Sequence, residues 1–130
     1  IRLSEFINRK RDKDILVSII IRKSNRRLKY DAVRRAKTDF PVLTCAVVAG
    51  PVHGKETWYF SVGARPMKAK VLEKKWSIPR DISDGLLMDY AKEAAAGFDY
   101  GTNMRGSAEY RRHLAEVLIR RSMHAILMEE

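Results

Sequence analysis

The chain has 130 residues, a net charge of +10 and a single cysteine, with 45% hydrophobic and 32% charged residues. This length suits one domain, because a chain of this size buries about two-thirds of its unfolded surface around one core. The composition excludes a disordered polyelectrolyte, and no apolar run approaches the roughly 20 residues that a membrane-spanning helix needs. Basic charge alone is compatible with nucleic acid, an anionic cofactor, an acidic partner or a membrane surface.

The first part of the sequence predicts a lead-in segment followed by a strand. Residues 1–13 are charged and lack periodicity, so the domain proper is expected to occupy residues 14–130. The chain starts with Ile1 and has no signal-peptide layout, which indicates a piece of a longer protein. Residues 14–23, "DILVSIIIRK", are rich in isoleucine and predict a buried β-strand.

Two further β-rich runs are expected to pair. Residues 28–41 are ambiguous between an extended piece and a helical turn that ends before a proline. The runs "VLTCAVVAG" and "TWYFSVGA" predict antiparallel strands joined by a long loop over residues 50–56. Cys45 lies within the first run, where a thiol behaves as a small buried hydrophobe. A single unpaired cysteine fits a reducing, cytoplasmic setting.

The remainder of the chain predicts helices. Residues 67–76, "MKAKVLEKKW", are a short helical candidate. A longer helix follows, with Asp81 or Ser83 as its N-cap and Gly97 in a left-handed C-cap. The last helix should begin after Ser107 and run to about residue 128. Strands followed by helices indicate an α+β fold in which about three helices cover one face of a mainly antiparallel sheet.

Two arginines of the last helix are expected on its apolar side. When Leu118 is set at the centre of the apolar arc, Arg111 and Arg121 fall within it. A buried guanidinium without a partner costs several kcal/mol, so either carboxylates neutralise these arginines or the arc is partly an interface. We favour the first alternative and predict a structural ion pair between Arg111 and Asp39.

The sequence offers no complete active site. It has no phosphate-binding loop, no dinucleotide-binding glycine motif, no nucleophile elbow and no C-x-x-C motif. The three histidines lack companions at metal-ligand spacing; they are His53, His113 and His124. We therefore expect no catalytic residues and no metal site, and an independent enzyme is disfavoured.

Four segments in order carry a family resemblance: "DILVSIII", "YDAVRRAKTDFPVLTCAVV", "SVGARPMKA" and "RGSAEYRRHLAEVLIRR". This series resembles the C-terminal domain of the FAD-binding (medium) subunit of the molybdenum hydroxylases, the group that contains xanthine dehydrogenase and aerobic carbon monoxide dehydrogenase. Residues 1–13 are similar to the tail of the FAD-binding region that precedes this domain. The resemblance implies three or four antiparallel strands packed against three helices.

The resemblance also implies a supporting role in an oxidoreductase. The domain would assist flavin electron transfer and subunit assembly, with FAD in the full-length parent protein and none expected on this chain alone. Its partners would be the upstream FAD-binding domain and the molybdopterin-binding and iron–sulfur subunits or domains.

The resemblance further implies cofactor contacts. It places Leu16 or Val17 near the flavin and adds Tyr30 as a further contact, together with a lysine directly after this aromatic. This sequence has Asp31 and Ala32 there, and its strand end "SVGA" lacks the paired glycines common in relatives.

A rival function belongs to a different class. The chain could be a stand-alone basic module that binds RNA or another polyanion, which a steep salt dependence of binding would reveal. The basic residues are scattered along the sequence, so nucleic acid is the less favoured partner, and no membrane partner is expected.

Overall fold

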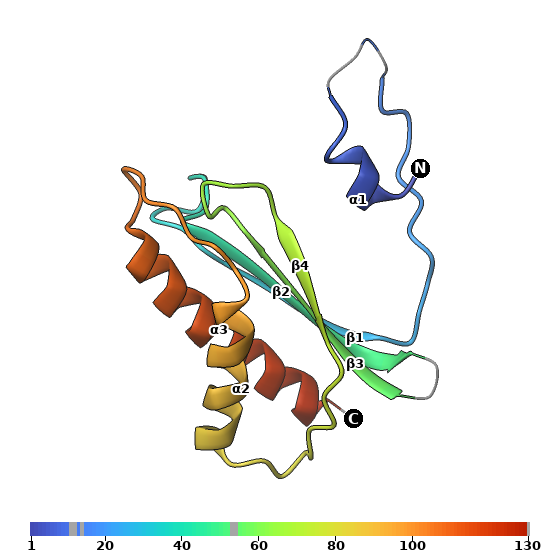
Figure 1. The fold of residues 1–130 in the computed structure, drawn as a ribbon, viewed down its shortest axis with the longest axis vertical. Helices are drawn as coiled ribbons and strands as arrows, with labels where there is room; N and C mark the ends of the chain where they lie inside the picture. Colours follow the sequence, from blue (N-terminus) through green and yellow to red (C-terminus); the bar gives the residue numbers. More distant parts are fainter. Residues whose placement is uncertain (11–12, 14, 53–54, 130) are drawn as a thin grey trace.

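The domain is a four-stranded antiparallel sheet with two long helices packed on one face (Figure 1). The computed structural model describes residues 1–10, 13, 15–52 and 55–129. The strands, in spatial order, are β1 (Arg27–Val33), β2 (Leu43–Val52), β3 (Lys55–Gly63) and β4 (Lys70–Lys74). The helices are α1 (Leu3–Phe6), α2 (Asp84–Ala96) and α3 (Ala108–Met128). The predicted α+β class is confirmed, with two helices on the sheet and the short α1 lying apart from it.

The central hairpin of β2 and β3 forms as predicted. The two strands are antiparallel and in register from the pair Thr44 and Gly63 to the pair Val52 and Lys55. The loop is shorter than expected because Gly50 lies within β2. The predicted turn residues 53 and 54 lie outside the described residues.

The strand predicted over residues 14–23 is wrong. Its described part, residues 15–23, belongs to no strand and is exposed throughout. The first strand is instead β1, within the stretch that was ambiguous from sequence. It pairs with β2 from Arg27 opposite Ala49 to Val33 opposite Leu43. A strand needs a neighbour for its backbone groups, and of these two stretches only β1 has such a neighbour among the described residues.

The helix predicted over residues 67–76 is also wrong, because this stretch contains β4. The strand pairs with β3 and places Leu72 opposite the buried Phe60. Leu72 is half-buried, whereas Val71 and Glu73 on either side of it are exposed. This alternation has the period of two that is typical of a sheet with one covered face.

Serine caps begin both long helices as the sequence predicts. Ser83 accepts a hydrogen bond from the backbone N–H of Leu86 at 3.4 Å, and Ser107 accepts one from Tyr110 at 3.1 Å. Gly97 ends α2, but its φ of −76° is not left-handed, so that part of the prediction is wrong. A Cβ at this glycine would lie 2.8 Å from Leu72 Cδ2, so close packing against β4 explains the residue.

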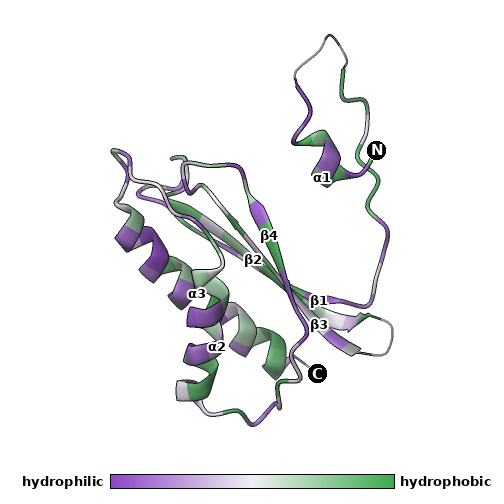
Figure 2. Cartoon of the chain, in the orientation of Figure 1, coloured by the Kyte–Doolittle hydropathy of each residue, from purple (hydrophilic) through white to green (hydrophobic). Residues whose placement is uncertain are grey.

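The core lies between the sheet and the two helices. Strand residues on the covered face meet the inner faces of α2 and α3, which burial of apolar surface holds together. Figure 2 shows the hydrophobic residues on the elements and also along the N-terminal segment that leaves the body of the domain. The largest fully buried apolar side chains are Trp58, Phe60, Leu43, Leu87, Ile119, Met123 and Ile126.

The start of β1 and the end of α3 meet at one corner of the domain. Arg27 Nη1 donates a hydrogen bond to the carbonyl oxygen of Ile126 at 2.9 Å. Lys29 forms an ion pair with Glu129 directly after the helix. Residues almost a full domain apart in sequence are therefore fixed side by side.

Candidate functional site

The N-terminal segment exposes an unusual amount of apolar surface. Residues 15–25 form neither helix nor strand, and exposure of its large apolar side chains runs from 53% at Leu16 to 91% at Val17. Scattered exposed apolar residues are ordinary, but a contiguous run marks a surface that another molecule covers. The exposed side chains are Ile15, Leu16, Val17, Ile19, Ile20 and Ile21.

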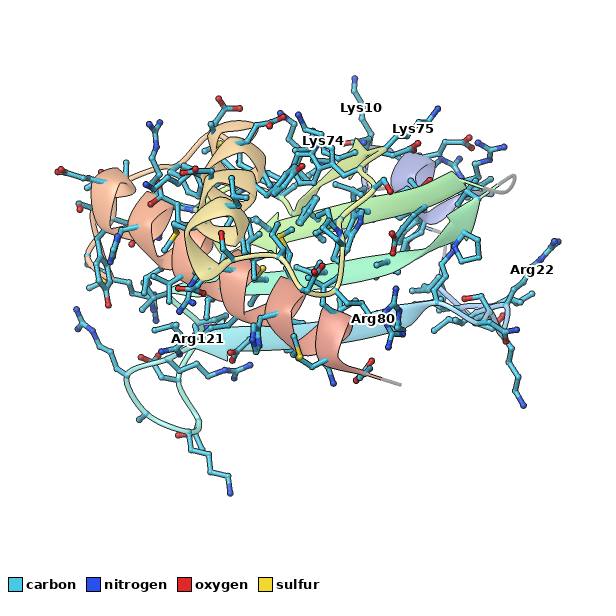
Figure 3. All side chains as sticks on the ribbon, turned by 90° about the horizontal axis from the view of Figure 1, so that it is seen from below. Lys10, Arg22, Lys74, Lys75, Arg80 and Arg121 are labelled. Atoms are coloured by element: carbon cyan, nitrogen blue, oxygen red, sulfur yellow. The ribbon has the colours of Figure 1, made fainter. Side chains whose placement is uncertain are left out.

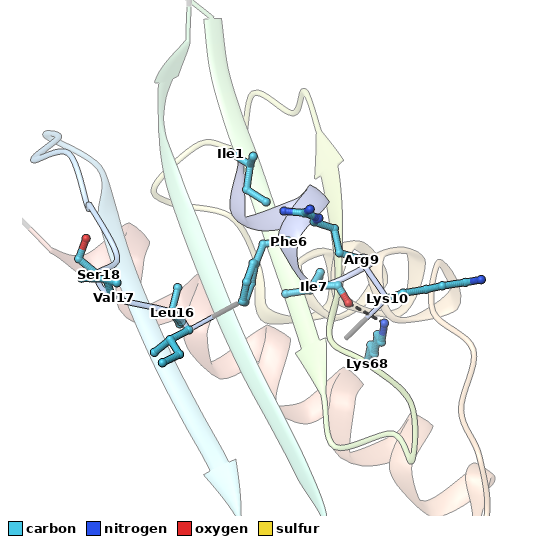
Figure 4. A pocket seen from close by; sticks show the side chains of 10 residues that line it. Ile1, Phe6, Ile7, Arg9, Lys10, Leu16, Val17, Ser18 and Lys68 are labelled. Atoms are coloured by element: carbon cyan, nitrogen blue, oxygen red, sulfur yellow. Dashed lines mark hydrogen bonds between the residues drawn. The ribbon is translucent and has the colours of Figure 1, made fainter. Parts of the chain in front are cut away.

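An open pocket of about 790 Å³ lies where this segment passes α1. Leu16 and Val17, the two residues singled out from the sequence, both line it (Figure 4). The lining also includes three cationic side chains, of which Lys68 donates a hydrogen bond from Nζ to the Ile7 carbonyl oxygen at 2.6 Å. The full lining comprises Ile1, Phe6, Ile7, Arg9, Lys10, Ile15, Leu16, Val17, Ser18 and Lys68.

Tyr30 lies elsewhere, on the uncovered face of the sheet. It is 60% exposed and stands opposite Ala46 in the β1–β2 register. It does not line the pocket that holds Leu16 and Val17. The structure thus brings two of the three predicted contact residues together.

Asp31, which stands where the family resemblance implied a lysine, lies beside the buried cysteine. Its Oδ1 accepts a hydrogen bond from the Ala32 backbone N–H at 2.8 Å, and its register partner is Cys45. Burial raises the pKa of Cys45 to about 12, and the charge of Asp31 adds to this effect. The thiol is therefore protonated at neutral pH and is not an activated nucleophile.

Arg111 is buried as predicted, but its partners are not carboxylates. It is 1% exposed, and its Nε donates to the Val42 carbonyl oxygen at 3.0 Å. Nη1 donates to the carbonyl oxygens of Gly101, at 2.7 Å, and Gly106. Nη2 donates to Asn103 Oδ1 at 2.5 Å. Oxygen dipoles from the two loops that precede β2 and α3 therefore satisfy a guanidinium that the core surrounds.

The predicted ion pair between Arg111 and Asp39 is wrong. Asp39 Oδ1 instead lies 3.4 Å from Arg105 Nη2, and both of these side chains are about one-third exposed. Burial lowers the pKa of Arg111, and the positive charge of Arg105 lowers it further. The Asp39 carboxylate therefore pairs with the more exposed arginine, Arg105. The desolvation cost of this pair is lower than that of a pair with the buried Arg111.

Arg121 is exposed, which contradicts its predicted place on the buried arc (Figure 3). The buried residues of α3 include Ile119, Met123 and Ile126, which all lie to one side of Leu118. The centre of the buried arc is therefore displaced from Leu118 by about 70°, and Arg121, about 60° to the other side of Leu118, falls beyond its edge.

Arg65 is a second buried arginine, which sequence reasoning missed. It is 4% exposed, its Nε donates to the Val62 carbonyl oxygen at 3.2 Å, and its Nη2 donates to that of Lys68 at 2.8 Å. Nη1 donates to the Asp99 carbonyl oxygen in the loop before α3. Because all partners are backbone carbonyls, no acidic residue in the sequence signals this role.

The described residues contain no group of three or more histidine, cysteine, aspartate or glutamate side chains placed to hold a metal ion. In the same part of the chain, no helix is both long and apolar enough to span a membrane.

The arrangement is an α+β domain whose two buried arginines hold a loop and whose apolar N-terminal segment lies outside its core. Residues 29–126 match the model of the CO dehydrogenase flavoprotein C-terminal domain, and the chain belongs to this family. The family predicted from the sequence is thereby confirmed. No curated protein sequence matches the chain.

Three solved structures share the fold. Quinoline 2-oxidoreductase from Pseudomonas putida 86 superposes with a TM-score of 0.61 at 18% identity, over 80% of this chain and 38% of that one. A cyanide-inactivated Cu,Mo-CO dehydrogenase gives 0.60 at 20% identity, over 82% and 38%. Carbon monoxide dehydrogenase from Hydrogenophaga pseudoflava lacking the Mo-pyranopterin moiety gives 0.59 at 18% identity, over 80% and 37%. The chain thus spans less than two-fifths of each related chain.

Proposed function

We propose that this domain braces a flavin-binding module within a molybdenum hydroxylase-type oxidoreductase and takes part in its subunit assembly. The observation that carries the proposal is the exposed apolar run of residues 15–21, which precedes β1 and has no partner within the described part of the domain. Membership of the flavoprotein family supports an upstream FAD-binding domain as the surface that covers this run. Residues 1–13 would be the tail of that domain, and residues 14–130 the C-terminal domain.

The pocket beside α1 fits one wall of a flavin site. Leu16 and Val17 offer apolar surface to a flat ring system, and Lys10 and Lys68 offer positive charge to a diphosphate. The sequence has no glycine-rich phosphate-binding loop, so the upstream domain would supply most of the contacts to FAD. Bound flavin supplies the electron-transfer chemistry, while these side chains orient it and exclude water. A contact from Tyr30 stays a prediction.

The proposed assembly includes further partners. The molybdopterin-binding and iron–sulfur subunits or domains would pack around the flavin module, in the cytoplasm, where Cys45 remains a reduced thiol. This domain would contribute rigid support through its arginine-held loop rather than catalytic groups.

The proposal is tested on the full polypeptide that the gene encodes. Replacing both Leu16 and Val17 with serine should lower FAD content per protein and leave thermal unfolding of the C-terminal domain unchanged. The matched control replaces Leu86, an apolar residue on α2 that is about as exposed as Leu16, with serine. FAD content and unfolding should both be unaffected in this control.

Two results would contradict the proposal. Equal FAD content in the Leu16/Val17 variant and the Leu86 control would show that Leu16 and Val17 do not contact the flavin. Tight, steeply salt-dependent RNA binding by a polypeptide without flavin would favour the rival module. Figure 3 shows Lys10, Lys74 and Lys75 along one edge of the view and Arg22 and Arg121 far from them, so the labelled cations do not gather in one patch as an RNA-binding face would.

A further inference from the structure

Two loops form an exposed cluster at the end of the sheet where β1 stops and β2 starts. The first connects these strands over residues 34–42, and the second precedes α3 over residues 97–107. Arg35 Nη2 donates to the Met104 carbonyl oxygen at 3.4 Å and so joins the two loops. We call this surface the loop cluster; its side chains are Arg34, Arg35, Lys37, Asp39, Phe40, Met104 and Arg105.

Two large apolar side chains of the loop cluster point into solvent. Phe40 is 75% exposed and Met104 is 86% exposed. An exposed apolar side chain usually has no contacts that restrict its motion, but Phe40 has two. The guanidinium of Arg105 lies 5.4 Å from the centre of the Phe40 ring, and the backbone N–H of Phe40 donates to Asp39 Oδ1 at 2.7 Å. A fixed and exposed aromatic side chain is preorganised for contact with another molecule.

The second loop is equally rigid. Asn103 Oδ1 accepts from the Arg105 backbone N–H at 2.9 Å and from the buried Arg111 at 2.5 Å. The backbones of Asn103 and Gly106 exchange two hydrogen bonds at 3.1 Å. The core therefore fixes the loop that carries Met104 and Arg105, so little ordering entropy would be lost when a partner binds.

Charge selects the partner. The basic side chains Arg34, Arg35 and Lys37 are exposed around Phe40. The two carboxylates of the loops already have cationic partners, Asp39 with Arg105 and Asp99 with Lys70. Carboxylates around an apolar recess would complement this combination of cations and apolar anchors. A second copy of this chain, with its net charge of +10, would be repelled.

We propose that the loop cluster is a docking surface for an acidic face of a different protein, with Phe40 and Met104 as the central anchors. A protein fits better than a nucleic acid. One face of the Phe40 ring is already covered by Arg105, and Met104 offers no flat surface for base stacking. This surface is separate from the pocket that contains Leu16 and Val17, so its role does not depend on the proposed flavin contact.

The test places a photoreactive benzoylphenylalanine at position 40 of the full-length protein in its native host. Light should link this position to a peptide of another polypeptide that contains several aspartates or glutamates. The yield should fall about tenfold when Lys37 is replaced with glutamate, since charge reversal at an interface costs more than a kcal/mol. The matched control replaces Lys92, an exposed cation on α2, with glutamate and should leave the yield unchanged.

Several outcomes would overturn the docking surface: no cross-link, a link to this chain or its copy, a link to RNA, or equal yields in the two lysine variants. Should the substitution at position 40 prevent folding, the photoreactive residue at position 104 provides the same readout. The FAD content of each sample is measured in parallel. Absence of the cross-link together with normal FAD content would contradict the docking surface alone and leave the proposed flavin role intact.

Discussion

Arg65 and Arg111 are joined through a single glycine. The backbone N–H of Gly101 donates to the Arg65 carbonyl oxygen at 2.8 Å, and the Gly101 carbonyl oxygen accepts from Arg111 Nη1 at 2.7 Å. A Cβ at Gly101 would lie 3.0 Å from the same Arg65 oxygen, so the close approach favours glycine. Two buried cations thus hold the loop before α3 against the sheet without any carboxylate.

Replacing Arg111 with methionine should destabilise the domain by about 3 kcal/mol or more, because several buried acceptors lose their donor at about 1–3 kcal/mol each. Urea unfolding followed by circular dichroism measures this change. Replacing the exposed Arg121 of the same helix with methionine is the control and should change stability by less than about 0.5 kcal/mol. Equal effects of the two substitutions would show that Arg111 is not the structural centre of this loop.

Replacing Asp39 with asparagine should cost less than about 1 kcal/mol, because its pair with Arg105 is partly exposed. The asparagine keeps an oxygen that can accept from the Phe40 backbone N–H. Combined with Arg111→Met, the two effects should add, since the two residues share no direct contact. A coupling energy above about 1 kcal/mol in urea unfolding would contradict the independence of these two side chains.

Replacing Ala64 with glycine should stabilise the domain by up to about 1 kcal/mol. Ala64 has a φ of 56°, a left-handed conformation that costs an alanine about 1–2 kcal/mol, and the greater unfolded-state entropy of glycine offsets only part of this gain. The family resemblance implies paired glycines at this strand end, where this chain has Gly63 followed by Ala64. Thermal unfolding is the measurement, and a lower melting temperature than wild type would refute the explanation.

Stability should fall as the pH rises above 9. Burial raises the pKa of Cys45 from 9.0 to about 12 and that of Tyr100 from 10.0 to about 12. Between these limits the unfolded chain releases protons that the folded domain keeps, so stability drops by up to about 1.4 kcal/mol per pH unit for each group. Urea midpoints should therefore be constant with respect to these groups below pH 9 and decline up to about pH 12.

The alkaline decline can be assigned with one variant. In Cys45→Ala the part that starts at pH 9 should disappear, and the part that Tyr100 contributes should remain. An unchanged slope from pH 9 to 10 in this variant would mean that Cys45 is not the group responsible.

Local patterns were sufficient to predict part of the fold. The hairpin of β2 and β3 has dense β-branched and aromatic residues on both sides of a turn, and α3 has both a serine cap and a long apolar stripe. Residues 15–21 carry an equally strong strand pattern, yet they have no partner within the described domain. A sequence pattern reports apolar surface that will be buried, but not which molecule buries it.

Site residues could be predicted only where the spacing of a side chain along a helix indicates that it is buried. Helical spacing placed Arg111 in the core, because its position relative to Leu118 is fixed by geometry. Its partners were not predictable, since carbonyl oxygens belong to every residue. Arg65 was missed for the same reason, because its burial depends on the turn at Ala64 and on a loop more than thirty residues later.

The contact between Arg27 and Ile126 has a consequence for how this unit can be transplanted. Because the start of β1 and the end of α3 lie at one corner, the folded domain can be inserted into a surface turn of an unrelated host protein without separating the two ends of that turn. The same geometry permits circular permutation, with new ends opened elsewhere and a short linker joining the old ones. Such a cassette would carry its own hydrophobic interior with it into each new setting.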